Sequence, residues 1–107
     1  MEGKILTQLL EWLAKEPKDI FLQYAVAMEY KKFDVAKAIE ILEQLRCNEP
    51  QYLPTYYILA ELYVEKQQNE QAKIVYEAGI MVAKEQKEQK TLAELQNAYT
   101  NFLIELE

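Results

Sequence analysis

An internal repeat of 33 to 34 residues runs through the sequence. A shift of 33 places identical residue types on each other, namely Pro17 on Pro50, Ala27 on Ala60 and Tyr30 on Tyr63. Further along, a shift of 34 places Ala38 on Ala72 and the apolar Leu42 on Tyr76. A period of this length is typical of chains built from one stacked supersecondary unit. The sequence therefore predicts two copies of one unit, the first with a turn shorter by one residue.

Each copy carries two stripes of apolar residues at helical spacing. In the second copy the first stripe follows the i, i+3, i+4, i+7 spacing of one helix face and consists of Tyr56, Leu59, Ala60 and Tyr63. A second stripe follows after residues 67–69, with Ala72, Val75, Tyr76, Gly79 and Ile80. The pattern predicts helix hairpins and no β-sheet. We expect six helices, near 2–15, 19–32, 34–47, 53–67, 69–86 and 89–105.

Polar residues and a proline mark the expected helix ends. Asp19, Asp34 and Asn69 each stand where an N-cap side chain accepts a hydrogen bond from free backbone amides. Pro54 suits the first turn of a helix, because its missing N–H would have no partner there. Residues 84–90 have strong helix propensity. We nevertheless expect a break in this segment, since the last helix must reverse direction to pack its apolar stripe.

These stripes resemble the pattern of the tetratricopeptide repeat family, in particular its small stand-alone bacterial members. In the first helix of a repeat, the family pattern has an aromatic residue, Leu, a small residue and Tyr, and residues 51–84 match it with Tyr56, Leu59, Ala60 and Tyr63. In the second helix the pattern has Ala, an aromatic residue and a small residue, and the matching residues are Ala72, Tyr76 and Gly79. The first copy matches through Val26, Ala27, Tyr30, Ala38, Leu42 and Pro50. It departs from the pattern at Gln23, where an aromatic is usual, and at Leu45, where a small residue is usual.

The resemblance implies an all-α fold, a right-handed α-solenoid of antiparallel helix hairpins. We expect a single domain over residues 1–107. In this domain two repeats, 18–50 and 51–84, lie between half-repeat capping helices at 1–17 and 85–107.

The two ends of the chain carry apolar stripes of their own. At the N-terminal end, the residues that fall where the second helix of a repeat has its inward side chains are Ile5, Leu9 and Trp12. At the other end, one amphipathic stripe runs through Leu92, Leu95, Tyr99, Phe102 and Leu106. We predict that both stripes pack inward.

The composition argues against most kinds of chemistry. The chain has no histidine and a single cysteine, Cys47, so imidazole bases, His-containing triads, intramolecular disulfides and cysteine-based zinc clusters are excluded. Its formal net charge of −6 repels phosphate backbones. No apolar run approaches the roughly 20 residues that span a bilayer. We therefore expect no enzyme activity, no cofactor or metal, no nucleic-acid or membrane partner, and a cytoplasmic location.

The candidate binding residues are those of the first helices that do not face the core. In the second repeat these are Tyr57, Glu61, Val64 and Glu65, and in the first repeat Phe21, Tyr24, Met28, Lys31 and Lys32. In the family that the chain resembles, first helices line a concave groove that takes extended peptides or partner helices. The resemblance thus implies a non-catalytic scaffold that binds a protein or peptide. The alternative is a homo-oligomer, such as a homodimer, whose groove is occupied by a second copy.

Overall fold

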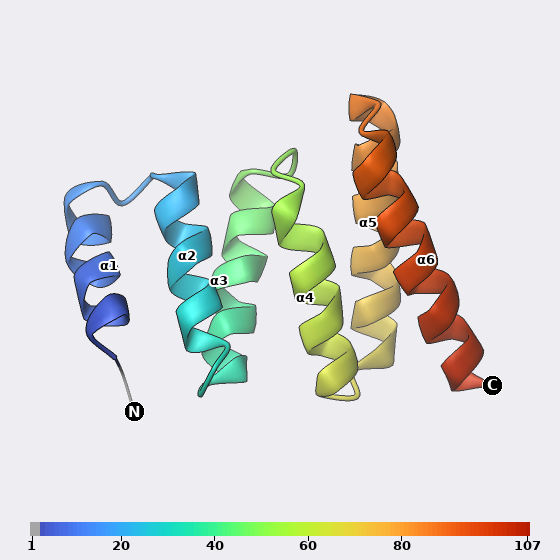
Figure 1. Cartoon of the computed structure of the whole chain (residues 1–107), viewed down its shortest axis with the longest axis horizontal. Coiled ribbons are helices and arrows are strands. Elements are labelled where there is room, and N and C mark those ends of the chain that lie inside the picture. The colour runs from blue at the N-terminus through green and yellow to red at the C-terminus, as the bar shows by residue number, and fades with distance from the viewer. Residues whose placement is uncertain (1–2) are drawn as a thin grey trace. The chain divides into compact units, whose positions relative to one another are not determined.

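The computed structural model describes residues 3–107, and in these residues it contains six α-helices and no strand (Figure 1). The helices are α1 (Lys4–Lys15), α2 (Ile20–Tyr30), α3 (Val35–Asn48), α4 (Pro54–Glu65), α5 (Asn69–Gln86) and α6 (Gln89–Leu106). Every expected helix is present. The expected start of the first helix at residue 2 lies outside the described residues, and every other end lies within two residues of its expected position. The all-α fold class predicted from the repeat is confirmed.

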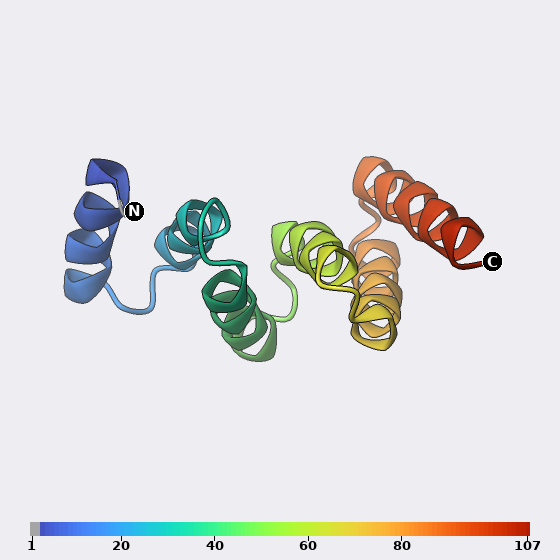
Figure 2. The same cartoon turned by 90° about the horizontal axis from the view of Figure 1, so that it is seen from below.

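The chain divides into two compact units, one ending at Glu49 and one running from Pro50 to Glu107. In the first unit α2 contacts both α1 and α3, and in the second unit α5 contacts both α4 and α6 (Figure 2). The boundary between the units lies beside Pro50, the residue that closes the first copy of the sequence repeat. Each unit thus consists of one repeat hairpin and one additional helix.

The helix starts follow the expected chemistry in three of four cases. Asp19 accepts a hydrogen bond from the Leu22 amide at 2.9 Å, and Asp34 accepts one from the Lys37 amide at 3.1 Å. Pro54 occupies the first turn of α4. The prediction for Asn69 is wrong, because Asn69 is already the first residue of α5 and Gln68 is the N-cap, with no side-chain hydrogen bond.

The predicted stripes of both repeats form the core. In the second unit Tyr56, Leu59, Ala60 and Tyr63 of α4 are buried, as are Ala72, Val75, Tyr76 and Gly79 of α5. In the first unit the buried set includes Val26, Ala27, Ala38, Leu42 and Leu45. Close packing of these apolar side chains removes their surface from water, which is the main favourable term in folding.

The prediction for the N-terminal helix is wrong about which face is buried. Ile5 is 62% exposed and Trp12 is 49% exposed, whereas Leu6 is 1% exposed. The inward residues of a second helix need the first helix of the same repeat to pack against, and residues 3–107 contain no helix in that place. α1 therefore turns toward α2 a different stripe, to which the buried Leu6 and the half-buried Leu10 and Leu13 belong.

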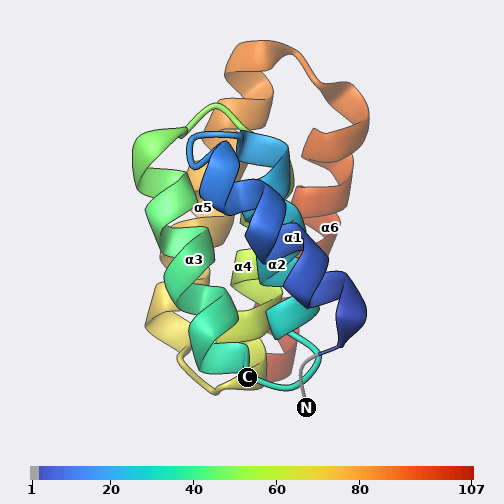
Figure 3. The same cartoon turned by 90° about the vertical axis from the view of Figure 1, so that its left-hand side faces the viewer.

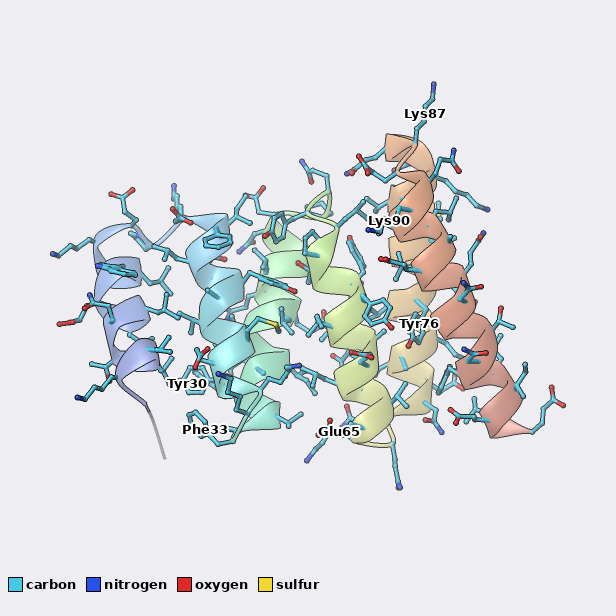
Figure 4. All side chains as sticks on the ribbon, in the orientation of Figure 1. Tyr30, Phe33, Glu65, Tyr76, Lys87 and Lys90 are labelled. Atoms are coloured by element: carbon cyan, nitrogen blue, oxygen red, sulfur yellow. The ribbon has the colours of Figure 1, made fainter. Side chains whose placement is uncertain are left out.

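The expected break between the last two helices is confirmed. α5 ends at Gln86, α6 begins at Gln89, and Lys87 takes the left-handed conformation with φ of 59° (Figure 4). The reversal lets α6 pack on α5, with Leu95 and Phe102 buried. Leu106, expected on the same stripe, is 43% exposed at the end of α6.

Candidate functional site

The predicted site residues of the first unit lie on one side of α2 and in the turn that follows it. They are Phe21, Tyr24, Met28, Lys31 and Lys32, and we call this set the first-unit face. Phe21 is 69% exposed, while Tyr24, Met28 and Lys31 are half-buried. Lys32 is exposed and forms an ion pair with Glu29 at 3.1 Å. This face therefore combines accessible apolar surface with two ammonium groups at one end.

The predicted site residues of the second unit lie on α4. They are Tyr57, Glu61, Val64 and Glu65, and we call this set the second-unit face. Tyr57 and Val64 are half-buried, and both glutamates are exposed. Figure 4 marks Glu65 near the end of α4. Within residues 3–107 neither glutamate forms an ion pair with a lysine or arginine. Two uncompensated carboxylates beside an aromatic ring make this face attractive to a cation.

A cluster of aromatic rings lies next to the second-unit face. Tyr76 of α5 stacks on Tyr99 of α6 with ring centroids 5.4 Å apart, and Phe102 lies 5.9 Å from Tyr76 (Figure 4). Burial raises the pKa of Tyr76 to about 12, and the negative charge of Glu61 adds to the increase. Glu61, which belongs to the second-unit face, therefore acts electrostatically on a ring of this cluster.

The Tyr99 hydroxyl joins α6 to α5 through a hydrogen bond. It donates to Oε2 of Glu77 at 2.6 Å. The pKa of Tyr99 is raised to about 12, and burial is the largest cause of this increase. The hydrogen bond to Glu77 is the next cause, followed by the negative charges of Glu77 and Glu70. A bond to a carboxylate is stronger than a neutral one, so this contact helps to fix α6 on α5.

Sequence reasoning missed a second candidate surface in the first unit. Trp12 of α1 and Phe21 of α2 line a pocket of about 380 Å³, together with Lys15, Glu16, Asp19 and Leu22. Trp12 had been assigned to the core, so it was not considered as a surface residue. The spacing of Leu6, Leu10 and Leu13, which also follows one helix face, is the signal that would have placed Trp12 outside.

Metal-binding clusters and membrane-spanning helices are absent from the part of the chain that the structure describes. Residues 3–107 contain no group of three or more His, Cys, Asp or Glu side chains arranged to hold a metal ion. None of the helices in this range combines the length and the apolar character needed to cross a bilayer. Cys47 is a free, exposed thiol.

Comparison with known proteins identifies the repeat. The sequence model of the tetratricopeptide repeat matches residues 29–95. A solution structure of a tetratricopeptide repeat domain protein from Salinibacter ruber is 39% identical with a TM-score of 0.76, over 80% of this chain and 88% of that one. A crystal structure of a tetratricopeptide repeat domain protein from the same organism is 38% identical with a TM-score of 0.74, over 79% and 96%.

A third structure shows the same fold at lower identity. A solution structure of a protein from Bordetella parapertussis has a TM-score of 0.84 and 19% identity, over 96% of this chain and 90% of that one. No curated protein matches the chain. The match of the repeat model to more than half of the residues agrees with the buried stripes and the helix hairpins described above. The chain belongs to the tetratricopeptide repeat family.

Proposed function

We propose that the protein is a non-catalytic scaffold that binds a segment of another protein or peptide, and that the first-unit face and the second-unit face each supply contact residues. Tetratricopeptide repeats are generally protein–protein interaction modules, and their families are generally non-catalytic. The proposal adds to this general activity the residues that make the contact. It also places the activity in the cytoplasm without a cofactor.

The observation that carries the proposal is the composition of the second-unit face. Tyr57 presents a half-buried aromatic ring on α4, one helical turn before the exposed Glu61. Aromatic side chains held on a rigid element lose little conformational entropy on binding, and they supply much of the energy of interfaces. An aromatic anchor of this kind fits a binding role better than a structural one, since the core does not bury it.

The charges on the two faces give the bound segment a direction. Lys31 and Lys32 lie at the end of the first-unit face, whereas Glu61 and Glu65 lie on the second-unit face. Complementary charges fix the register of a partner more than they add affinity. We expect a segment with apolar anchors, an acidic end toward the lysines and a basic end toward the glutamates.

The test begins with affinity capture from the native host on wild-type protein and on the double variant Tyr24→Ala/Tyr57→Ala. A captured protein is then titrated against wild type, Tyr57→Ala and the control Glu70→Ala, which changes an exposed residue on α5. We expect Tyr57→Ala to weaken binding by more than about 2 kcal/mol, the usual threshold for a dominant interface residue, and Glu70→Ala to leave it unchanged. Equal affinities for all three proteins would remove the second-unit face from the binding site. Equal capture by wild type and the double variant would remove both faces.

The alternative is a homo-oligomer in which a second copy of the chain occupies these faces. The half-buried Tyr57 and Met28 are the residues that such a copy would cover. Light scattering separates the two functions, because an open scaffold has both faces free at any concentration. In the homo-oligomer, Tyr57→Ala would release monomers, and the same variant would leave the mass of an open scaffold unchanged.

A further inference from the structure

The outer side of α1 carries large apolar side chains that the first unit does not cover. Ile5 is 62% exposed, Trp12 is 49% exposed, and Leu9 lies half-buried beside them. Because residues four and seven apart share one side of a helix, these three side chains form a single stripe. α1 lies at the edge of the first unit, with α2 between it and α3 (Figures 2 and 3). The stripe therefore runs along a side of α1 that α2 leaves largely uncovered, and Trp12 borders α2 at its end.

The stripe is continuous with the pocket at the end of α1. Trp12 forms one wall of this pocket of about 380 Å³, and Phe21, which is 69% exposed, forms another. Ile5 lies two helical turns away from Trp12 and projects into solvent. One end of α1 therefore presents a branched apolar side chain, and the other end presents a cavity with aromatic walls.

From this surface we propose that the chain forms a two-fold symmetric dimer through α1, with Ile5 of each copy inserted beside Trp12 and Phe21 of the other. In this dimer the two α1 helices run antiparallel, and the two-fold axis passes between Gln8 and Leu9. Ile5 of each copy then lies opposite Trp12 of the other copy. A symmetric dimer uses the same patch on both copies, so the patch must be complementary to itself. A projection and a cavity at opposite ends of one helix meet that condition.

Charges beside the stripe favour the same arrangement. Lys4, Glu11 and Lys15 lie on one flank of the stripe, and within residues 3–107 neither Lys4 nor Glu11 forms an ion pair. In the antiparallel dimer Lys4 lies about two residues, or roughly 3 Å along the helix axis, from both Glu11 and Lys15 of the second copy. Glu16 of the second copy is one residue further away. Each Lys4 ammonium group is thus near two carboxylates of the second copy, those of Glu11 and Glu16. It is near only one ammonium group, that of Lys15.

The dimer shares one residue with the proposed binding site, because Phe21 also belongs to the first-unit face. Its other contacts lie on α1, so Tyr57→Ala, which tests the binding site, changes no residue of the dimer contact. One pair of 12-residue helices buries less than the roughly 1,200 Å² of a standard stable interface, so weak association is expected. The measurements must therefore extend from about 1 µM to about 1 mM chain.

Trp12 is the only tryptophan of the chain, so it reports directly on this surface. The experiment follows the Trp12 emission maximum and the light-scattering mass of the full chain over that concentration range. We expect the mass to double and the emission to shift to shorter wavelength together, as Trp12 leaves water. A constant mass with constant emission up to about 1 mM would overturn the proposal.

Variants separate this surface from the others. Ile5→Glu changes an exposed side chain and should weaken the dimer at least tenfold, with Trp12 emission independent of concentration. The matched control Ile104→Glu alters a 59% exposed isoleucine on α6 and should leave the dimer intact. Loss of association in Ile104→Glu or Tyr57→Ala, with Ile5→Glu still dimeric, would assign the interface to α6 or to the second-unit face and reject the proposal.

A mixing experiment tests the symmetry of the contact. Lys4→Glu faces Glu11 with a like charge in its own dimer, and Glu11→Lys faces Lys4 with a like charge, so each variant alone should associate more weakly than wild type. Mixed in equal amounts they should form a heterodimer, because one contact then pairs Glu at position 4 of one chain with Lys at position 11 of the other. The second contact is the native pair of Lys4 with Glu11. Failure of the mixture to associate more tightly than either variant would contradict the antiparallel register.

Discussion

The two repeats fill the space between their paired helices in different ways, because the large side chain comes from the first helix in one repeat and from the second helix in the other. In the second repeat Tyr56 of α4 lies against Gly79 of α5, and a β-carbon at position 79 would lie only 2.6 Å from Cβ of Tyr56. The equivalent residues in the first repeat are Gln23 and Leu45, so the large side chain has moved from the first helix to the second. The repeat preserves the filling of the space between the helices, while the identity of the residue that fills it changes.

One hydrogen bond is preserved through this exchange. The Tyr56 hydroxyl donates to the carbonyl of Pro50 at 2.5 Å, and Nε2 of Gln23 donates to the carbonyl of Pro17 at 3.0 Å. Both bonds reach back six residues to the proline that precedes the hairpin. The polar tip of the side chain is therefore kept even where the aromatic ring is lost, because the proline carbonyl still needs a donor.

The largest effect should come from adding bulk at Gly79. Gly79→Leu places a side chain where Cβ and Cγ of Tyr56 already lie within 2.9 Å, and we expect the free energy of unfolding to fall by about 3 kcal/mol. The double variant Tyr56→Gln/Gly79→Leu recreates the pair of the first repeat and should recover at least about 1 kcal/mol of that loss. Chemical denaturation followed by circular dichroism measures both values, and a double variant no more stable than the single would show that the two repeats are not equivalent here.

Removing the hydrogen bond to the proline carbonyl, which both repeats share, should have the next largest effect on stability. Tyr56→Phe keeps the ring and leaves the Pro50 carbonyl without its donor, which should lower the free energy of unfolding by about 1 kcal/mol. Gln23→Met in the first repeat should lower it by about 0.5 kcal/mol, since that bond is exposed and water can replace the donor. A larger loss at Gln23 than at Tyr56 would reverse the ranking of the two repeats.

The first unit has better capped helices than the second unit. α2 and α3 of the first unit have aspartate caps, whereas the N-cap residue of α5, Gln68, makes no side-chain hydrogen bond. Gln68→Asp should therefore stabilise the chain by about 0.5 kcal/mol. Asp34→Asn is the matched control, because it retains a capping side chain and should change stability little. Thermal unfolding of the three proteins provides the comparison.

The effect that is smallest at neutral pH appears only at alkaline pH and is specific to the second unit. The pKa values of Tyr76 and Tyr99 rise from 10.0 to about 12, so the folded chain holds these phenol protons more tightly than the unfolded chain does. Their contribution to stability is complete below pH 10 and is lost as the pH rises toward 12. Denaturation at pH 9, 10 and 11 should show falling stability, and Tyr99→Phe should make the decline shallower. An identical decline in Tyr99→Phe would remove Tyr99 as a cause.

The repeat in the sequence predicts the helices and most of the core, because apolar periodicity and burial have the same physical origin. The repeat does not predict burial or contacts that depend on a neighbouring helix outside the repeat pattern. The buried face of α1 depends on which helix packs against it, so the repeat register gave Ile5 and Trp12 instead of Leu6. The contact of Tyr99 with Glu77 joins residues 22 positions apart on two helices, and no local pattern encodes it. The helical spacing located both candidate faces on α2 and α4, but spacing alone contains no information about a partner.

The turn between α5 and α6 has a consequence for handling the protein. α5 has 18 residues against 12 in α4, and in the second unit the α5–α6 turn extends beyond the end of α4 (Figure 1). Exposed Lys84, Lys87 and Lys90 flank or form this turn (Figure 4). Exposed turns are preferred sites of proteolysis, so we expect brief trypsin treatment to cut here first. The ring contacts of Tyr76 with Tyr99 and Phe102 would hold the cut halves together, which makes this turn the place to insert a tag or a label.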